Sequence, residues 1–327
     1  MKQLLLVLFA LFCVQLSFSQ GEASNWYFGS GAGLNFDPNT GTVTADPSAI
    51  GTISTNEGCS SISDPNGNLL FYTDGRTVWD RNFQIMPNAD YLGGSGLLGD
   101  PSSTSSAVIV PKPGNADQYY IFTVDEPHHN NAWAYPDQGP ADQNGNPIGF
   151  YEETFGNQPT SINIDDGFNN GFNYTLVDLS LNGGFGDVVP TEKNIHLITY
   201  DPNDQSHVPY KCAEKITAVE HADGDSYWVI THFIDTFYAF RVDSNGVNPN
   251  AVTSQQTPFI TTEGYRRNGI GYLKSSPDGS KLAICHAQNL DTPSSNTASG
   301  NTGSLWLYDF DNLTGMVNNP LNLQNNT

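Results

Sequence analysis

Carboxylates are the side chains of this sequence with the clearest potential for chemistry. Asp74, Asp125, Glu126 and Glu263 flank strand-like runs, and two carboxyl groups facing one sugar can serve as acid and base in a glycan hydrolase or lyase. Such chemistry also needs basic partners, yet the chain has 34 acidic and only 12 basic residues, and its acidic residues fall mainly in turns. The sequence therefore raises an enzyme hypothesis without supplying a catalytic set.

Metal and nucleophile motifs are weak. His128 and His129 form the only adjacent pair among the seven histidines, and polar loops commonly hold such pairs in solvent. His232 and His286 end equivalent strand-like runs, which favours a structural role. There is no Gly-x-Ser-x-Gly elbow, and the Asp-rich turns lack the distal Glu of a calcium loop while matching the needs of hairpin turns. We expect no metal, no cofactor and no catalytic triad.

Aromatic residues in loops offer an alternative function. Their rings can stack on a sugar or pack against a protein partner, and the candidates are Trp79, Trp133, Tyr135 and Tyr265. These residues predict a non-catalytic binding or scaffold module for a glycan or a protein. The alternative is a polysaccharide lyase or hydrolase that uses the carboxylates named above.

One hairpin signature recurs four times. A polar turn leads into an aromatic and β-branched run that ends in Thr or His, and the runs begin at residues 69, 119, 227 and 282. Each is preceded by another strand-like run, near residues 59, 107, 216 and 271. A repeat of about 50 residues built from short strands is typical of propeller blades. The predicted fold is all-β, a β-propeller of WD-like four-stranded blades with little helix.

The repeats predict an incomplete propeller. Four units are visible, and residues 25–45 resemble the outer half of a further blade because Asn35 to Val43 repeat the turn of Tyr308 to Val317. The wide interval between the second and third units contains third- and fourth-strand patterns at 172–183 and 195–199, so the surplus is a long insertion at about 125–170. We expect a truncated ring whose open edges associate with other chains. Trp228 should be a packing residue of a central strand.

The N-terminus and the overall charge indicate an exported protein. Lys2 precedes an apolar run, and Ser17 and Ser19 suit signal-peptide cleavage before Gln20, which assigns 1–19 to a signal peptide and 20–327 to the propeller region. No later segment has the apolar length of a membrane span. The net charge of −22 disfavours nucleic acid as a partner. Cys59, Cys212 and Cys285 form no disulfide or zinc pattern, so we interpret them as small buried hydrophobic residues.

Several segments together resemble a known group of proteins. Most of the chain from residue 25 onward is similar to the N-terminal propeller region of type IX-secreted surface proteins that carry a type B (gliding motility-associated) C-terminal sorting domain. The similarity lies in Asn25 to Gly29, Glu57 to Cys59, Gly67 to Gly75, Val78-Trp79, Gly99 to Ser103, Val110 to Pro113, Tyr119 to Thr123, Leu181 to Gly184, Asp225 to His232 and Ser276 to Leu282. The resemblance implies a modular cell-surface or secreted protein that uses the type IX route and acts in adhesion, and it brings no catalytic set. This chain lacks the sorting domain and the later blades of that pattern.

Overall fold

The computed structural model describes residues 21–125, 133–134, 168–204, 206–208, 210–262, 268–287 and 303–325. These residues are almost entirely β-structure, as the sequence predicts. Helix is confined to short 3-10 segments, namely η2 (Gly21–Ala23), η3 (Asn182–Gly184) and η4 (Pro190–Glu192), apart from a brief helical assignment at Asn268 and Gly269. The insertion expected at 125–170 falls mostly outside the described residues.

Among the described residues, five antiparallel sheets follow one another in sequence order, and none of the five closes on itself. The first sheet contains β1 (Asn25–Phe28), β2 (Ala32–Phe36) and β3 (Val43–Ala45), and the second contains β4 (Ser60–Ser63), β5 (Leu69–Thr73) and β6 (Val78–Asp80). The third contains β7 (Ala107–Pro111), β8 (Gln118–Val124), β11 (Phe172–Asp178), β12 (Asp187–Val188) and β13 (Ile195–Leu197).

The C-terminal half contains the other two antiparallel sheets. The fourth contains β14 (Ile216–Glu220), β15 (Tyr227–Phe233), β16 (Thr236–Asp243), β17 (Gly246–Val247) and β18 (Val252–Gln255). The fifth contains β19 (Gly271–Ser275), β20 (Lys281–His286), β21 (Ser304–Asp311) and β22 (Met316–Asn325). A two-residue parallel pair, β9 (Trp133–Ala134) with β10 (Phe168–Asn169), stands apart from them.

The polar turns form hairpins for local reasons. Before β5, the Asp64 carboxylate accepts hydrogen bonds from the backbone N–H groups of Asn66 and Asn68, at 2.8 and 2.9 Å, and Gly67 takes a φ of +88°. A positive φ suits glycine because a Cβ would crowd the backbone there. Asp278 plays the same role before β20, accepting from the N–H of Ser280. These Asp-rich turns therefore use their carboxylates to cap the turn.

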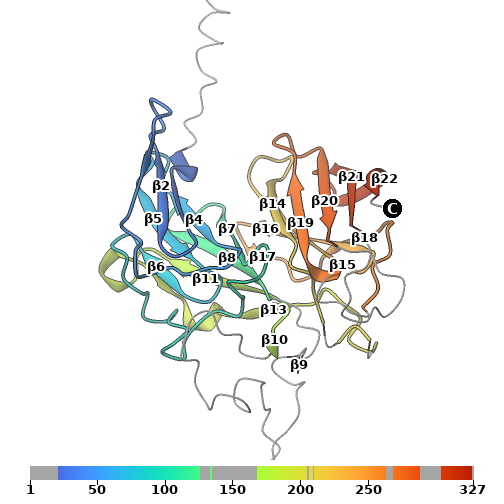
Figure 1. Cartoon of the computed structure of the whole chain (residues 1–327), viewed down its shortest axis with the longest axis horizontal. Helices are drawn as coiled ribbons and strands as arrows, with labels where there is room; N and C mark the ends of the chain where they lie inside the picture. The colour runs from blue at the N-terminus through green and yellow to red at the C-terminus, as the bar shows by residue number, and fades with distance from the viewer. Residues whose placement is uncertain are drawn as a thin grey trace, which may run out of the picture.

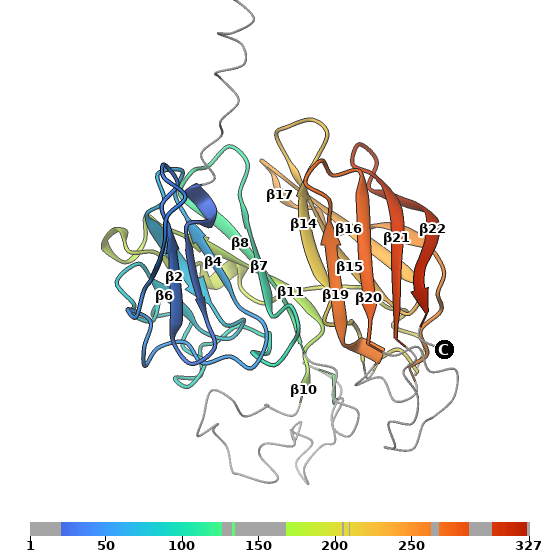
Figure 2. The same ribbon diagram turned by 45° about the horizontal axis from the view of Figure 1, so that its top comes forward.

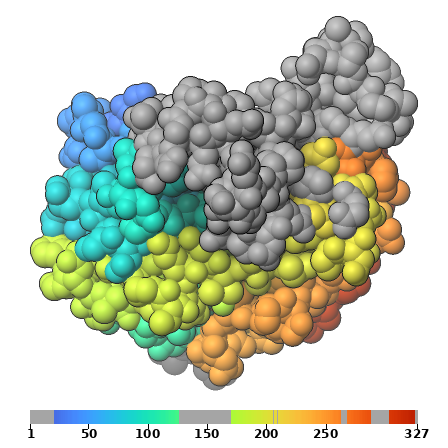
Figure 3. Space-filling model, turned by 90° about the horizontal axis from the view of Figure 1, so that it is seen from below, coloured from blue at the N-terminus to red at the C-terminus, as the bar shows by residue number. Residues whose placement is uncertain are grey.

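The sheets run in chain order from the blue to the red end of the molecule (Figures 1 and 2), and apolar side chains pack between them. Alternation along each strand places successive residues on opposite faces, so each inner sheet packs against a neighbour on both sides. One core cluster joins the first and second sheets, another the second and third, another the third and fourth, and another the fourth and fifth. On the face shown in Figure 3, the N-terminal sheets and the fifth sheet lie on opposite sides.

Most predicted strands are confirmed, with two differences. Residues 25–45, expected as an outer half-blade, form a separate three-stranded sheet that packs on the second sheet through Tyr27, and among the described strands it does not pair with those near residues 305–325. The first difference is that the second sheet has three strands instead of the expected four, and beyond β6 only a single bridge joins Trp79 to Ile85. The second difference concerns the cysteines: Cys212 is buried, but Cys285 is exposed because it lies on the outer face of the fifth sheet.

Candidate binding groove

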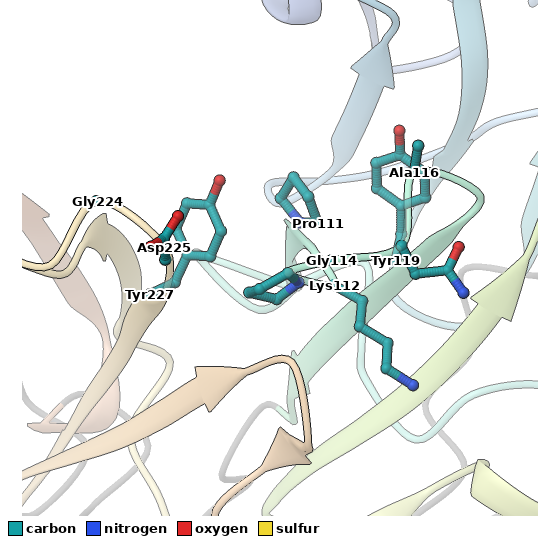
Figure 4. Close-up of a pocket in the computed structure, with 10 residues that line it drawn as sticks. Pro111, Lys112, Gly114, Ala116, Tyr119, Gly224, Asp225 and Tyr227 are labelled. Atoms are coloured by element: carbon teal, nitrogen blue, oxygen red, sulfur yellow. The ribbon is translucent and has the colours of Figure 1, made fainter.

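A groove of about 490 Å³ lies between the turn ends of the third and fourth sheets (Figure 4). The turn between β7 and β8 forms one side, and the turn before β15 forms the other. Its aromatic surface comes from Tyr119 and Tyr227, and Pro111 lies between the two rings in the view of Figure 4. Both phenol groups point toward the same open side in that view, whereas the Lys112 side chain points away.

The repeat places the two tyrosines in the groove. Tyr119 pairs with Pro111 at the turn end of the β7–β8 hairpin, and Tyr227 pairs with Glu220 at the same place in the β14–β15 hairpin. Both side chains are half-buried. Tyr119 rests edge-on against the buried ring of Phe71, with centroids 5.7 Å apart. Packing on one side fixes each ring and leaves the other side open, so little entropy is lost when a ligand stacks there.

A second groove, of about 670 Å³, adjoins the first. It lies between the second and third sheets and shares Pro111, Ala116 and Tyr119 with its neighbour. Its wall is largely apolar and includes Ile62 and Leu70. Tyr119 therefore stands between two hollows on the same end of the molecule, so an extended ligand could contact both.

The grooves lie in a negative electrostatic environment. Burial raises the pKa of Tyr119, and the carboxylates of Asp117, Asp64 and Glu22 raise it further. Burial likewise raises the pKa of Tyr227, with contributions from Glu220 and Glu22. The Lys112 ammonium is directed to the face of Tyr120, 6.0 Å from its centroid. The phenols thus remain protonated donors at neutral pH, and the surrounding carboxylates disfavour an anionic ligand.

Of the four aromatic residues predicted to bind a ligand, the structure describes the side chain of one. Trp79 is only 3% exposed and stacks on Tyr72 at 5.2 Å in the core between the first two sheets, so its ring does not provide the expected binding surface. Trp133 is described only as backbone in β9, and Tyr135 and Tyr265 lie outside the described residues.

The carboxylates of the enzyme hypothesis serve internal contacts. Asp74 is fully buried and accepts hydrogen bonds from the N–H groups of Arg76 and Thr77, and burial raises its pKa. Asp125 is also buried and accepts from the Asn170 N–H. Glu126 and Glu263 lie outside the described residues.

A different pair of carboxylates converges on one hydroxyl. Glu214 Oε2 and Glu57 Oε2 lie 2.7 and 2.9 Å from Thr104 Oγ1, and Glu214 also accepts from the Thr104 N–H at 2.8 Å. Glu57 precedes the second sheet, Thr104 the third and Glu214 the fourth. These contacts therefore hold the three sheets together at their inner ends. Local sequence pattern could not predict this arrangement, because its members are far apart along the chain.

The histidines that end β15 and β20 pack together inside the molecule. The rings of His232 and His286 are 5.3 Å apart, and both side chains are buried. Burial, with a smaller contribution from Lys215, lowers the pKa of His232 to about 3 and that of His286 well below its ordinary value. Lys215 donates to the carbonyls of Asn268 and Gly269, and burial lowers its pKa to about 8.

These neutral imidazoles fit the structural role expected for His232 and His286. Among the described residues, no group of three or more His, Cys, Asp or Glu side chains is arranged to hold a metal ion. His128 and His129 lie outside those residues.

The sequence contained a signal for the groove that residue-by-residue inspection missed. Tyr119 and Tyr227 are both the first residue of the signature strand, directly after its polar turn. The two rings point in the same direction along the row of sheets, Tyr119 toward the second sheet and Tyr227 toward the third, and both line the groove where the two hairpin turns meet. A comparison of equivalent positions across the repeats identifies these two tyrosines. The criterion of an aromatic residue in a loop instead pointed to Trp79, which is buried.

Comparisons with known proteins place few constraints on the chain. No protein-family profile and no curated protein sequence matches it. Among solved structures, it is similar to a Bacteroides uniformis chain provisionally named as a 6-phosphogluconolactonase, with a TM-score of 0.36 and 9% identity over 90% of this chain. The chain spans 64% of that protein. Within the described residues, no helix has the length and apolar character needed to cross a bilayer.

Proposed function

We propose that this chain is an exported, non-catalytic binding module, and that its ligand is a neutral glycan bound across the groove between the third and fourth sheets. The observation that carries the proposal is the pair of half-buried tyrosines, Tyr119 and Tyr227, presented by adjacent sheets on one hollow. Tyrosine rings bind the apolar faces of sugars, and the phenol and nearby carboxylates can hydrogen-bond sugar hydroxyls.

The charge of the groove supports a neutral ligand. Carboxylates raise the pKa of both tyrosines, and Asp225 contributes a further carboxylate to the lining. A uronate or sulfated glycan would meet like charge there, whereas a neutral glycan would not. The same field would accept a cationic peptide, which is the competing protein ligand and forms one arm of the test.

The module belongs to a wider architectural proposal. The order of the sheets and their hairpin repeat support blades of a β-propeller. The signal-peptide pattern at 1–19 and the resemblance to type IX-secreted surface proteins support export to the cell surface, where a glycan ligand would be accessible. Loops at the end of a rigid stack of sheets are common places for such binding sites.

The enzyme alternative has less support. Asp74 and Asp125 are buried in hydrogen bonds to the backbone, and neither lines the groove. Glu57 and Glu214 share the hydroxyl of Thr104. Since these contacts join sheets, their simplest role is structural.

A glycan array containing neutral and acidic glycans, run beside an array of basic peptides, tests the proposal. We expect the purified protein to bind neutral glycans. Tyr119→Ala and Tyr227→Ala should each weaken binding by roughly three- to tenfold, because a stacking contact with an aromatic ring contributes about 1 kcal/mol. Tyr119→Phe and Tyr227→Phe are matched controls that retain the ring and should retain most of the affinity.

Three outcomes would contradict the proposal. Exclusive binding of basic peptides would identify a protein ligand, and binding of acidic glycans would contradict the electrostatic argument. Undiminished binding by both alanine variants would place the glycan elsewhere. Breakdown of a bound polysaccharide by the wild-type protein would refute the non-catalytic assignment.

A further inference from the structure

The outer face of the fifth sheet carries an exposed apolar cluster, bordered by Lys274 beside Ala283 and by the Lys281–Asp309 ion pair. Leu307 pairs with Ala283 on one side and with Leu321 on the other, so the three side chains share one face. Tyr272 and Cys285 extend that face along the next row. Tyr272 is 46% exposed and Leu321 54% exposed. A contiguous apolar sheet surface of this kind marks an interaction site more often than an isolated exposed leucine does.

The third and fourth sheets use the equivalent face to pack on the sheet that follows. The second and fourth residues of the signature strand are Tyr120 and Phe122 in the third sheet, and both pack on the fourth sheet. Their equivalents Trp228 and Ile230 in the fourth sheet pack on the fifth. In the fifth sheet, the equivalents are Ala283 and Cys285. The exposed face therefore continues an interface that the molecule already uses twice.

The first sheet lies on the side of the molecule opposite the fifth sheet (Figure 1), and its outer face exposes apolar residues. Tyr27 faces inward to the second sheet, so alternation sends Trp26 and Phe28 outward. Trp26 is 49% exposed and contacts Phe36, with ring centroids 4.8 Å apart. Leu34 pairs directly with Trp26 and lies on the same face.

We propose that the occupant of the fifth sheet's outer face is the first sheet of a second copy of this chain. Each copy then presents one of the two complementary faces at each end, so the contact is head-to-tail and can extend to further copies. The chain's net charge of −22 opposes this contact, and salt screens that repulsion. Association should therefore strengthen as the salt concentration rises.

Sedimentation velocity of the full chain purified after export tests the proposal. The wild-type weight-average mass should rise with protein concentration and with salt. Leu307→Glu and Leu321→Glu should each raise the dissociation constant by roughly tenfold or more, because the contact would bury an unpaired carboxylate. Leu321 is largely exposed, so its substitution leaves folding intact even if Leu307→Glu does not. Leu313→Glu, at a turn residue that is 63% exposed, is the matched control and should behave as wild type.

Mixing two variants tests the head-to-tail geometry. Trp26→Glu disables the first-sheet face and Leu321→Glu the fifth-sheet face, so each alone should be monomeric. Mixed in equal amounts, they retain one intact face each and should form a one-to-one dimer. A wild-type protein that stays monomeric at high concentration and salt would overturn the proposal. A mixture of folded variants that stays monomeric, or association unaffected by these substitutions, would also overturn it.

Discussion

Replacing Trp228 by alanine should strongly destabilise the fourth and fifth sheets. The indole is only 4% exposed and packs among Leu282, Ile284 and other side chains of the cluster between those sheets. Removing such a side chain from a core costs about 3–5 kcal/mol. Its Nε1–H also donates to the Asn312 carbonyl at 2.9 Å, a bond worth about 1 kcal/mol. Asn312 is half-exposed, so in the variant water can donate to its carbonyl in place of the indole N–H. The lost hydrogen bond therefore adds little to the packing cost, and we expect the free energy of unfolding to fall by about 4 kcal/mol in total.

Urea unfolding and thermal melting measure this loss. The free energy of unfolding should fall by about 4 kcal/mol with little change in the m-value, and Tm by about 8 °C at about 2 °C per kcal/mol. Trp26→Ala is the matched control, since its ring is about half exposed, and it should cost no more than about 1 kcal/mol. Equal effects of the two substitutions, or an unchanged Tm for Trp228→Ala, would refute the packing account of the repeat.

Two further predictions concern the buried polar groups. The pKa of His232 is about 3 in the fold and about 6.5 in the unfolded chain, so the unfolded state binds the proton first, and stability should fall as pH drops from about 6.5 toward 3, by up to about 1.4 kcal/mol per pH unit. Equilibrium unfolding across that range should show a shallower slope for His232→Asn, and an identical slope would contradict the assigned burial. Glu214→Ala should cost about 1–3 kcal/mol in urea unfolding because it leaves the buried Thr104 N–H without its acceptor and leaves Glu57 as the acceptor of the Thr104 hydroxyl. Glu214→Gln keeps an acceptor and should cost less, so equal losses for the two variants would argue against these hydrogen bonds.

Local sequence pattern was sufficient to predict most strands. The runs starting at Leu69 and Tyr227 begin β5 and β15 at those residues, and the preceding runs became β4 and β14. Turn chemistry and alternating apolar residues determine these hairpins within about ten residues. The buried position of Trp228 is confirmed for the same reason.

Contacts between distant residues could not be predicted in this way. The turn repeated at residues 35–43 predicted an outer half-blade but not its neighbour, which the structure gives through the contacts of Tyr27 with Tyr72 and Phe83 on the second sheet. Trp79 follows a loop in the sequence but stacks inside the core. The groove is formed by two turns that are more than 100 residues apart in sequence. Local sequence pattern therefore could not predict it, and only a comparison of equivalent positions in the repeats could indicate that both turns carry a tyrosine.

A crystal structure of the protein with a neutral oligosaccharide, selected as the strongest binder among neutral glycans, tests the central claim most directly. We predict that a sugar ring stacks on Tyr119 or Tyr227, with its hydroxyls within hydrogen-bond distance of a groove carboxylate such as Asp225. A glycan found at another surface, with both tyrosine rings uncovered, would contradict the account.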